Sequence, residues 1–212
     1  MNARLHHNNR PQGCIGIDIG GTKIEGVLLD ATDRVVDVCR MPSHSGEDNV
    51  VTDIVRVARI LSNEPLPIGI GIPGQVTCAT GQVRNVVNLG IETLELGERI
   101  SEIMRAPVHV ENDVNAAAVG AAEFVEHVDG NATVVFLNFG TGLAAGLVRD
   151  GQAEHGYSGC IGEIGHLPVD PNGFACPCGQ RGCLETVASG GAVAKLWPSA
   201  NPPMPDLIRK AR

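Results

Sequence analysis

The alternation of apolar and polar residues divides the chain into short strands and helices. Two segments, residues 17–30 and 137–150, each place a glycine turn between apolar strands, a pattern typical of a β-hairpin. Further strands are predicted at residues 34–41, 67–72 and 107–110. Helical spacing of apolar residues occurs in four segments: residues 47–61, 94–104, 112–126 and 184–196. Strands followed by alternating helices and strands predict an α/β fold with a mixed sheet.

The two hairpins resemble each other. Residues 17–30 align with residues 137–150 without a gap, so that Gly20 matches Gly140 and Gly26 matches Gly146. We interpret this as a duplicated lobe in which each copy offers one glycine turn to a shared cleft. Chance similarity of two glycine-rich hairpins is the alternative.

Composition narrows the class of protein. Of the 212 residues 43% are hydrophobic but only 3% aromatic, so the core must consist mainly of Val, Ile, Leu and Ala. The net charge of −8 argues against nucleic acid or an anionic membrane as the main partner. No apolar run is long enough to span a bilayer, and the polar residues 1–12, expected to be disordered, lack the apolar core of a signal peptide. Seven cysteines without an export signal predict a cytoplasmic protein.

The most specific motif is a cluster of one histidine and three cysteines. His166, Cys176, Cys178 and Cys183 are close in sequence and separated by glycines that permit tight turns. One imidazole and three thiolates suit tetrahedral zinc, and four protein ligands predict a structural ion. Two carboxylates, Glu163 and Glu185, flank the cluster and suit a polyhydroxylated ligand. A pair of disulfides or inert buried thiols is the alternative.

Both glycine turns are candidate phosphate sites. After Asp18 come Gly20, Gly21, Thr22 and Lys23, which combine close backbone approach with a hydroxyl and a cation. Asp18 is suited to hold Mg²⁺ through water beside the phosphates. The turn is not a Walker A loop, and taken alone it fits a plain hairpin equally well. Pairing with the second turn, formed by Gly140, Thr141 and Gly142, favours a two-sided phosphate clamp.

Asp113 is the candidate general base. It stands where a predicted strand ends and a helix begins, and a carboxylate there can accept a proton from a hydroxyl that attacks a phosphoryl group. The alternative is a helix N-cap, which either Asn112 or Asp113 can provide. Both roles are compatible if one residue caps while the other faces the cleft.

Together these motifs resemble the ROK family of sugar kinases and sugar-responsive repressors. The resemblance covers residues 14–191 and rests on five motifs in the family's order: residues 18–23, 111–118, 140–142, 162–166 and 176–185. It implies an actin-like ATPase (ribonuclease H-like) fold, two lobes around a cleft, ATP-dependent phosphorylation of a hexose such as glucose or an N-acetylhexosamine, and a homodimer. It also implies Asp113 as the base and the following sugar contacts: Gly74, Asn88, Asn112, Asp113 itself, Glu163, His166 and Glu185. His166 would then bind zinc through one ring nitrogen and sugar through the other.

The chain departs from the family's pattern in three respects. Ala144 and Ala145 replace glycine after the second turn, and Ile161 replaces a small residue. Relatives continue further, so an incomplete second lobe, weak nucleotide binding and slow or absent turnover are expected. The predicted organisation is an N-terminal lobe at 13–115, a partial C-terminal lobe at 116–197 with a zinc loop at 166–183, and a proline-rich tail at 198–212. The alternatives are the effector-binding part of a ROK-type repressor and an inactive fragment that binds sugar and zinc.

Overall fold

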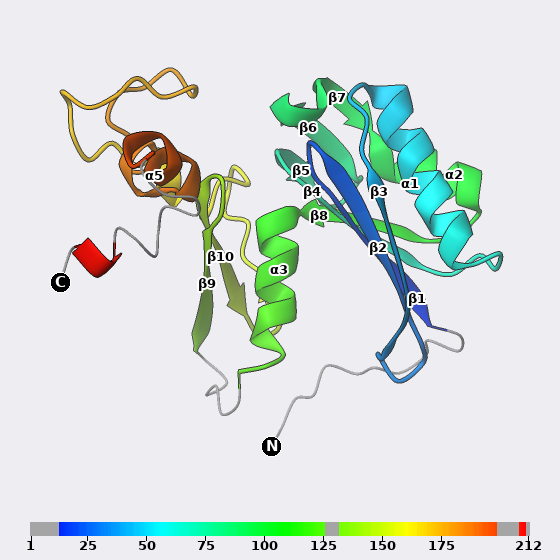
Figure 1. Cartoon of the computed structure of the whole chain (residues 1–212). Helices are drawn as coiled ribbons and strands as arrows, with labels where there is room; N and C mark the ends of the chain where they lie inside the picture. Colours follow the sequence, from blue (N-terminus) through cyan, green and yellow to red (C-terminus); the bar gives the residue numbers. More distant parts are fainter. Residues whose placement is uncertain (1–12, 126–131, 199–207, 211–212) are drawn as a thin grey trace. The chain divides into compact units, whose positions relative to one another are not determined.

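The computed structural model describes residues 13–125, 132–198 and 208–210 (Figure 1). The predictions for residues 1–12 and for most of the proline-rich tail lie outside these residues. The chain divides into two compact units, Met1–Ala116 (unit 1) and Ala117–Arg212 (unit 2). Within the described residues, no helix has the length and apolar character that crossing a bilayer requires.

Unit 1 is built on a five-stranded mixed sheet with the strand order β3-β2-β1-β4-β8. The strands are β1 (Cys14–Ile19), β2 (Lys23–Leu29), β3 (Val35–Pro42), β4 (Ile68–Ile72) and β8 (Val108–Asn112). The first three form an antiparallel meander, and β1, β4 and β8 run parallel. The carboxyl ends of the parallel strands therefore lie at one edge of the sheet, where open α/β sheets bind their ligands.

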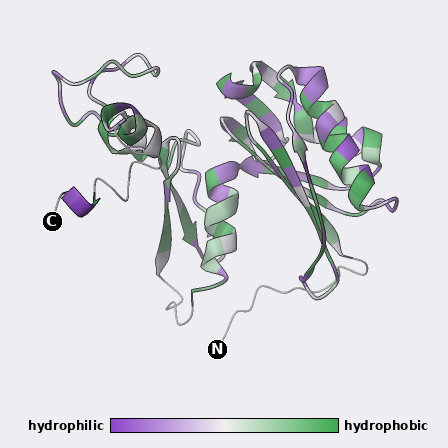
Figure 2. Cartoon of the chain, in the orientation of Figure 1, coloured by the Kyte–Doolittle hydropathy of each residue, from purple (hydrophilic) through white to green (hydrophobic). Residues whose placement is uncertain are grey.

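Helix α1 (Glu47–Leu61) has the predicted bounds and packs against the meander. Its buried face continues into the sheet core, which is rich in Ile, Val and Leu as the composition predicts. Hydropathy alternates along the helix in Figure 2, as expected for an element with one buried face. Gly26 permits the close approach, since a β-carbon there would lie 2.3 Å from Cγ1 of Val57.

The structure corrects three predicted boundaries. Residues 94 and 95 belong to a strand, β7 (Ile91–Glu95), and the helix α2 begins only at Leu96 and ends at Met104. Pairing of Leu94 with Val83 decides this, because the local apolar spacing fits either structure. Helix α3 (Asp113–Ala122) begins after Asn112 and ends before residue 126. Beyond Ala122, Phe124 and Val125 are exposed, so no packing extends the helix.

A second sheet in unit 1 is absent from the sequence-based prediction. It joins β5 (Gln75–Thr77), β6 (Gln82–Val86) and β7 in the order β5-β6-β7. The 3-10 turn η1 (Val87–Leu89) connects β6 to β7. These short strands carry few apolar residues each, and their stability comes from cross-strand pairing that a single segment does not reveal.

Unit 2 contains a three-stranded antiparallel sheet and the cysteine-rich segment. The strands β9 (Thr133–Phe139), β10 (Leu143–Arg149) and β11 (Gln152–Ala153) have the order β11-β10-β9. The predicted helix 184–196 is interrupted, forming α4 (Glu185–Ala188) and α5 (Gly190–Leu196). Ser189 lies at the break and caps α5, because its side chain accepts a hydrogen bond from the N–H of Ala192.

Both predicted hairpins are present, but their registers differ by one residue. In the first, Ile19 pairs with Ile24 around a four-residue turn. In the second, Phe139 pairs with Leu143 around the three-residue turn Gly140, Thr141 and Gly142. The gapless sequence alignment therefore superposes two hairpins whose turns are built differently.

Candidate functional site

Two carboxylates, Asp18 and Asp113, flank Gly71 at the carboxyl edge of the parallel strands. Asp18 on β1 pairs with Gly71 on β4, and Asp113 directly follows the neighbouring strand β8. A β-carbon at Gly71 would lie 3.8 Å from Oδ1 of Asp18 and 3.6 Å from Cα of Asp113. The absence of a side chain at Gly71 therefore leaves room between the two acids. Sequence reasoning missed Gly71, although a glycine in an otherwise Ile-rich strand was a usable signal.

Burial raises the pKa of both carboxyl groups above the ordinary value of 3.8. For Asp113, desolvation is the largest cause, and the negative charge of Asp18 adds to it. A hydrogen bond from the N–H of Val114 to Asp113 acts in the opposite direction. For Asp18, desolvation again dominates, while Lys23 opposes the shift. A carboxylate with a raised pKa is a stronger proton acceptor, which suits a general base.

Asn112 caps helix α3. Its Oδ1 accepts hydrogen bonds from the N–H groups of Val114 at 3.0 Å and Asn115 at 3.2 Å. Its Nδ2 donates to the carbonyl of Gly74 at 3.2 Å, which brings two of the predicted sugar contacts together. Because Asn112 caps the helix, Asp113 is not needed for that task. Asn115 is a buried polar residue that donates to Glu111 at 3.3 Å.

The first glycine turn is compact and lies beside Asn88. The N–H of Gly20 donates to the carbonyl of Lys23 at 2.9 Å, so this amide shapes the turn. A β-carbon at Gly21 would lie 3.0 Å from Cβ of Asn88, so only glycine fits here without displacing η1. Lys23 is exposed and lies 3.8 Å from Glu25. In unit 1 the candidate phosphate turn and the predicted sugar contact Asn88 are therefore neighbours.

The second glycine turn is held by α4 and α5. The N–H of Leu143 donates to Oε2 of Glu185 at 2.9 Å, and a β-carbon at Gly142 would lie 2.7 Å from the same oxygen. The N–H groups of Gly190 and Gly191 donate to the carbonyls of Gly140 and Thr141. In unit 2 the turn and the carboxylate of Glu185 therefore form one hydrogen-bonded structure.

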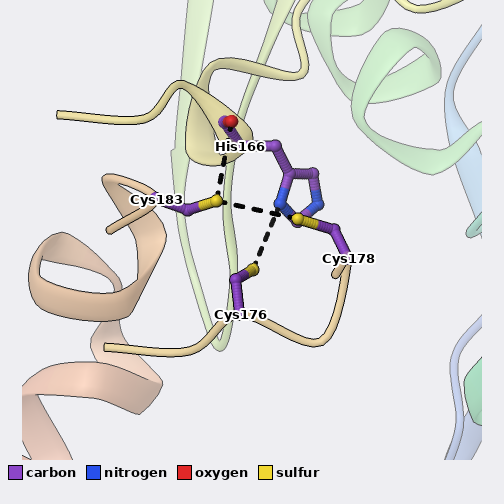
Figure 3. Close-up of side chains that lie close together, drawn as sticks. All are labelled: His166, Cys176, Cys178 and Cys183. Carbon is purple, nitrogen blue, oxygen red and sulfur yellow. Dashed lines mark hydrogen bonds between the residues drawn. The ribbon is translucent and has the colours of Figure 1, made fainter. Parts of the chain in front are cut away.

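The structure brings the four predicted zinc ligands together (Figure 3). Their ligand atoms lie within 4.8 Å of one another. Nδ1 of His166 is 3.6 Å from Sγ of Cys176, and the sulfur atoms of Cys178 and Cys183 are also 3.6 Å apart. Ligands at about 2.1–2.3 Å from a tetrahedral zinc ion lie about 3.5–3.8 Å from each other, so the spacing fits the metal. All three cysteines are free thiols, which does not favour the disulfide alternative.

Two further features of this cluster suit a metal. Hydrogen bonds, of which the backbone N–H of Gln180 makes the largest contribution, lower the pKa of the Cys178 thiol to about 7. At Cys178 the thiolate, the form that binds zinc, is therefore accessible near neutral pH, whereas burial and the neighbouring thiols raise the pKa of Cys183. The second ring nitrogen of His166, Nε2, lies 3.9 Å from Oε2 of Glu163. The imidazole thus presents one nitrogen to the thiols and the other to a predicted sugar-binding carboxylate.

Comparisons with known proteins identify the fold as the actin-like ATPase fold of the ROK family. The ROK family model matches residues 14–210, and the chain belongs to the ROK family. Glucokinase of Halalkalibacterium halodurans is 35% identical over 192 residues, covering 86% of this chain and 58% of that protein. N-acetylmannosamine kinase of Vibrio cholerae is 32% identical over 191 residues, covering 85% of this chain and 63% of that protein. The chain thus spans about three fifths of the length of these relatives.

Solved structures extend the likeness to two functional classes. A ROK family glucokinase from Streptomyces griseus, crystallised with glucose and AMPPNP, matches with a TM-score of 0.73 and 31% identity over 88% of this chain and 62% of that one. A ROK family transcriptional regulator, homologous to the MLC protein of E. coli, matches with a TM-score of 0.75 and 29% identity over 91% of this chain and 50% of that one. The fold is shared by kinases and regulators, so function has to be argued from the site.

Proposed function

We propose that the chain carries the machinery for ATP-dependent phosphorylation of a hexose, either glucose or an N-acetylhexosamine. The observation behind this proposal is the pair Asp18 and Asp113 across Gly71, with burial raising the pKa of both. Asp113 accepts the proton of the attacking sugar hydroxyl, since Asn112 already caps the helix. A regulator that binds sugar without turnover transfers no proton, so it would not need a general base.

In this proposal unit 1 also supplies the first phosphate contact. Thr22 and Lys23 offer a hydroxyl and a cation to the phosphates, next to the glycines of the same turn. Asp18 is the residue that would hold Mg²⁺, and an exposed carboxylate oxygen suits this hard cation. When bound, Mg²⁺ neutralises the charge that develops on the phosphates.

Unit 2 carries the other predicted sugar contacts and the second glycine turn. Glu163 and Glu185 offer carboxylates to sugar hydroxyls, and His166 offers Nε2. His166, Cys176, Cys178 and Cys183 would hold a structural zinc ion, because four protein ligands would leave no open position. Its role is to fix the imidazole so that Nε2 keeps one orientation.

A coupled assay of residues 1–212 with ATP and a panel of glucose, N-acetylglucosamine and N-acetylmannosamine tests the proposal. Because the chain spans only about three fifths of its relatives' length, we expect slow ATP-dependent formation of one phosphorylated sugar, lost in Asp113→Asn. A second candidate, sugar sensing without turnover, is favoured by the likeness to the ROK regulator. Sugar binding by calorimetry with no product from any sugar would support that candidate and contradict the kinase.

A further inference from the structure

Asp53 is a carboxylate on the apolar face of helix α1. It lies three residues after Val50 and four before Val57, both fully buried, and is itself only 5% exposed. Burying a carboxylate is costly unless strong hydrogen bonds compensate. An acid at this position therefore indicates a specific task, which neither the catalytic nor the zinc site explains.

The partners of Asp53 lie in the segment that precedes the helix. Oδ2 accepts a hydrogen bond from the backbone N–H of His44 at 2.8 Å, and Nδ1 of the same histidine lies 3.1 Å from Oδ2 and 3.2 Å from Oδ1. The imidazole is otherwise largely exposed, with 60% of its side-chain surface accessible. One buried carboxylate thus fixes both the backbone and the ring of His44.

The segment 43–46, which we call the bracket, connects Asp53 to the phosphate turn. Ser43 donates its hydroxyl to the carbonyl of Gly20 at 2.6 Å and its N–H to the carbonyl of Thr22 at 3.2 Å. Both acceptors belong to the turn that ends β1. The bracket therefore holds this turn from the side of its carbonyl groups, which leaves the hydroxyl of Thr22 and the ammonium of Lys23 outside these contacts.

The other end of the bracket holds the η1 turn. The N–H of Gly46 donates to the carbonyl of Leu89 at 2.7 Å, next to Asn88, and Asn88 lies against Gly21. Gly46 has a φ of 103°, a conformation that favours glycine. The contacts form a closed ring: phosphate turn, bracket, η1 and again phosphate turn.

We infer that Asp53 and His44 are positioning residues for the nucleotide phosphates, acting through the bracket on the turn Gly20–Lys23. The ligand class rests on the proposed function, whereas the mechanical link rests on the hydrogen bonds alone. The buried carboxylate keeps the bracket closed, and the bracket keeps the turn preorganised for a phosphate. Preorganisation of this kind lowers the ordering cost that binding would otherwise meet.

Hydrogen exchange followed by mass spectrometry on residues 1–212 tests the mechanical link. Asp53→Asn keeps the volume but removes the charge that holds two N–H groups. Losing a hydrogen bond to a charged acceptor raises an opening equilibrium by roughly 10–100-fold. We expect exchange to rise by about that factor at residues 43–46 and in the glycine turn, with the amides of β4 and β8 unchanged. Asp48→Asn is the matched control, because Asp48 lies on the same helix, is exposed and pairs with Arg99.

Affinity for Mg-ATP, measured by calorimetry, tests the consequence for binding. We expect affinity to fall roughly 3–10-fold in Asp53→Asn and in Ser43→Ala, and to stay unchanged in Asp48→Asn. A purely structural role for Asp53 would lower the melting temperature without changing affinity well below it. If Asp53→Asn does not fold, the affinity of Ser43→Ala tests the inference instead, because this variant removes only the hydroxyl that donates to the carbonyl of Gly20.

The outcomes separate this inference from the proposed function. Unchanged exchange in the turn of folded Asp53→Asn and of Ser43→Ala would overturn the inference even if ATP binds. Failure of the unmodified chain to bind Mg-ATP would contradict the kinase, while the exchange result would still decide whether Asp53 holds the turn.

Discussion

At the scale of single residues, the environment of Asp113 distinguishes a base from a cap. Asn112 makes the capping hydrogen bonds, and burial together with Asp18 raises the pKa of Asp113. The same burial that makes the carboxylate a better proton acceptor also makes its ionised form costly. Activity and stability are therefore linked at this position.

Asp113→Asn should lower turnover by about 10²–10⁴-fold, because general-base assistance typically contributes this much. Sugar affinity should change little, since the amide keeps the size of the side chain. In the unmodified protein, the pH at which turnover falls to half on the acid side should be higher than 3.8, because the pKa of Asp113 is raised above that ordinary value. Asp37→Asn is the control, because Asp37 is an exposed residue of β3. Near-normal turnover in Asp113→Asn would show that another carboxylate is the base.

The same substitution should change stability in a pH-dependent way. The folded-state pKa of Asp113 is raised, so folding favours the protonated form and the ionised form is penalised at neutral pH. Asp113→Asn should therefore raise the free energy of unfolding at pH 7, and the gain should shrink as the pH falls through the raised pKa. Denaturant unfolding of both proteins at several pH values measures this. A gain that grows towards acid pH would contradict the assigned shift.

At the scale of elements, two contacts decide how helices and loops are placed. One is the approach of α1 to the meander over Gly26, and the other is the cluster of His166 and three cysteines that closes the segment 166–183. The former is pure packing, and the latter depends on chemistry that local apolar patterns do not encode.

Gly26→Ala should destabilise the protein by about 1–3 kcal/mol, because the new methyl group would overlap Val57 and Leu61. Gly69→Ala is the matched control: it lies in the same sheet, and a β-carbon there meets nothing within 4 Å. Chemical denaturation of the two variants provides the comparison. Equal stability would show that α1 shifts without cost.

Protein purified without chelator should contain one zinc ion per chain, and Cys178→Ser should abolish it. Structural zinc in small motifs contributes roughly 10–16 kcal/mol of apparent binding free energy, so the cluster should lose its order without the ion. Elemental analysis measures the metal, and protease sensitivity of the segment 166–183 measures the order. Cys160→Ser is the control, since this exposed cysteine lies outside the cluster. A zinc-free preparation with an ordered segment would contradict the assignment.

At the scale of the whole molecule, strand β9 carries an exposed apolar face. Val135, Leu137 and Phe139 alternate along the strand and are 55%, 49% and 63% exposed. Alternate residues of a strand point to the same face, so the three form one continuous apolar surface. Such surfaces favour association.

Residues 1–212 should therefore associate in a concentration-dependent way, and Leu137→Thr together with Phe139→Thr should reduce it. Size-exclusion chromatography with light scattering across a concentration series measures the effect. Ile60→Thr, which changes an exposed apolar residue on α1, is the control. A molar mass of the unmodified chain that does not change with concentration would show that β9 is not an associating surface. The same holds if Ile60→Thr lowers the molar mass as much as the β9 substitutions do.

The sequence by itself determined the elements whose information is local. The period of apolar residues determined α1, glycine turns determined both hairpins, and the spacing of His166 and the three cysteines predicted that these four side chains cluster. Local sequence suffices in these cases because the residues that form each feature lie within about 20 positions of one another.

Only the tertiary structure decided the features that depend on distant partners. The β5-β6-β7 sheet, the start of α2 and the register of the second hairpin depend on pairing between strands. Gly71 between two acids and Asp53 beneath the bracket became visible once strands and helix were packed together. The physical reason is that burial, and with it the pKa of a carboxylate and the cost of a charge, is a property of the packed chain and not of a segment.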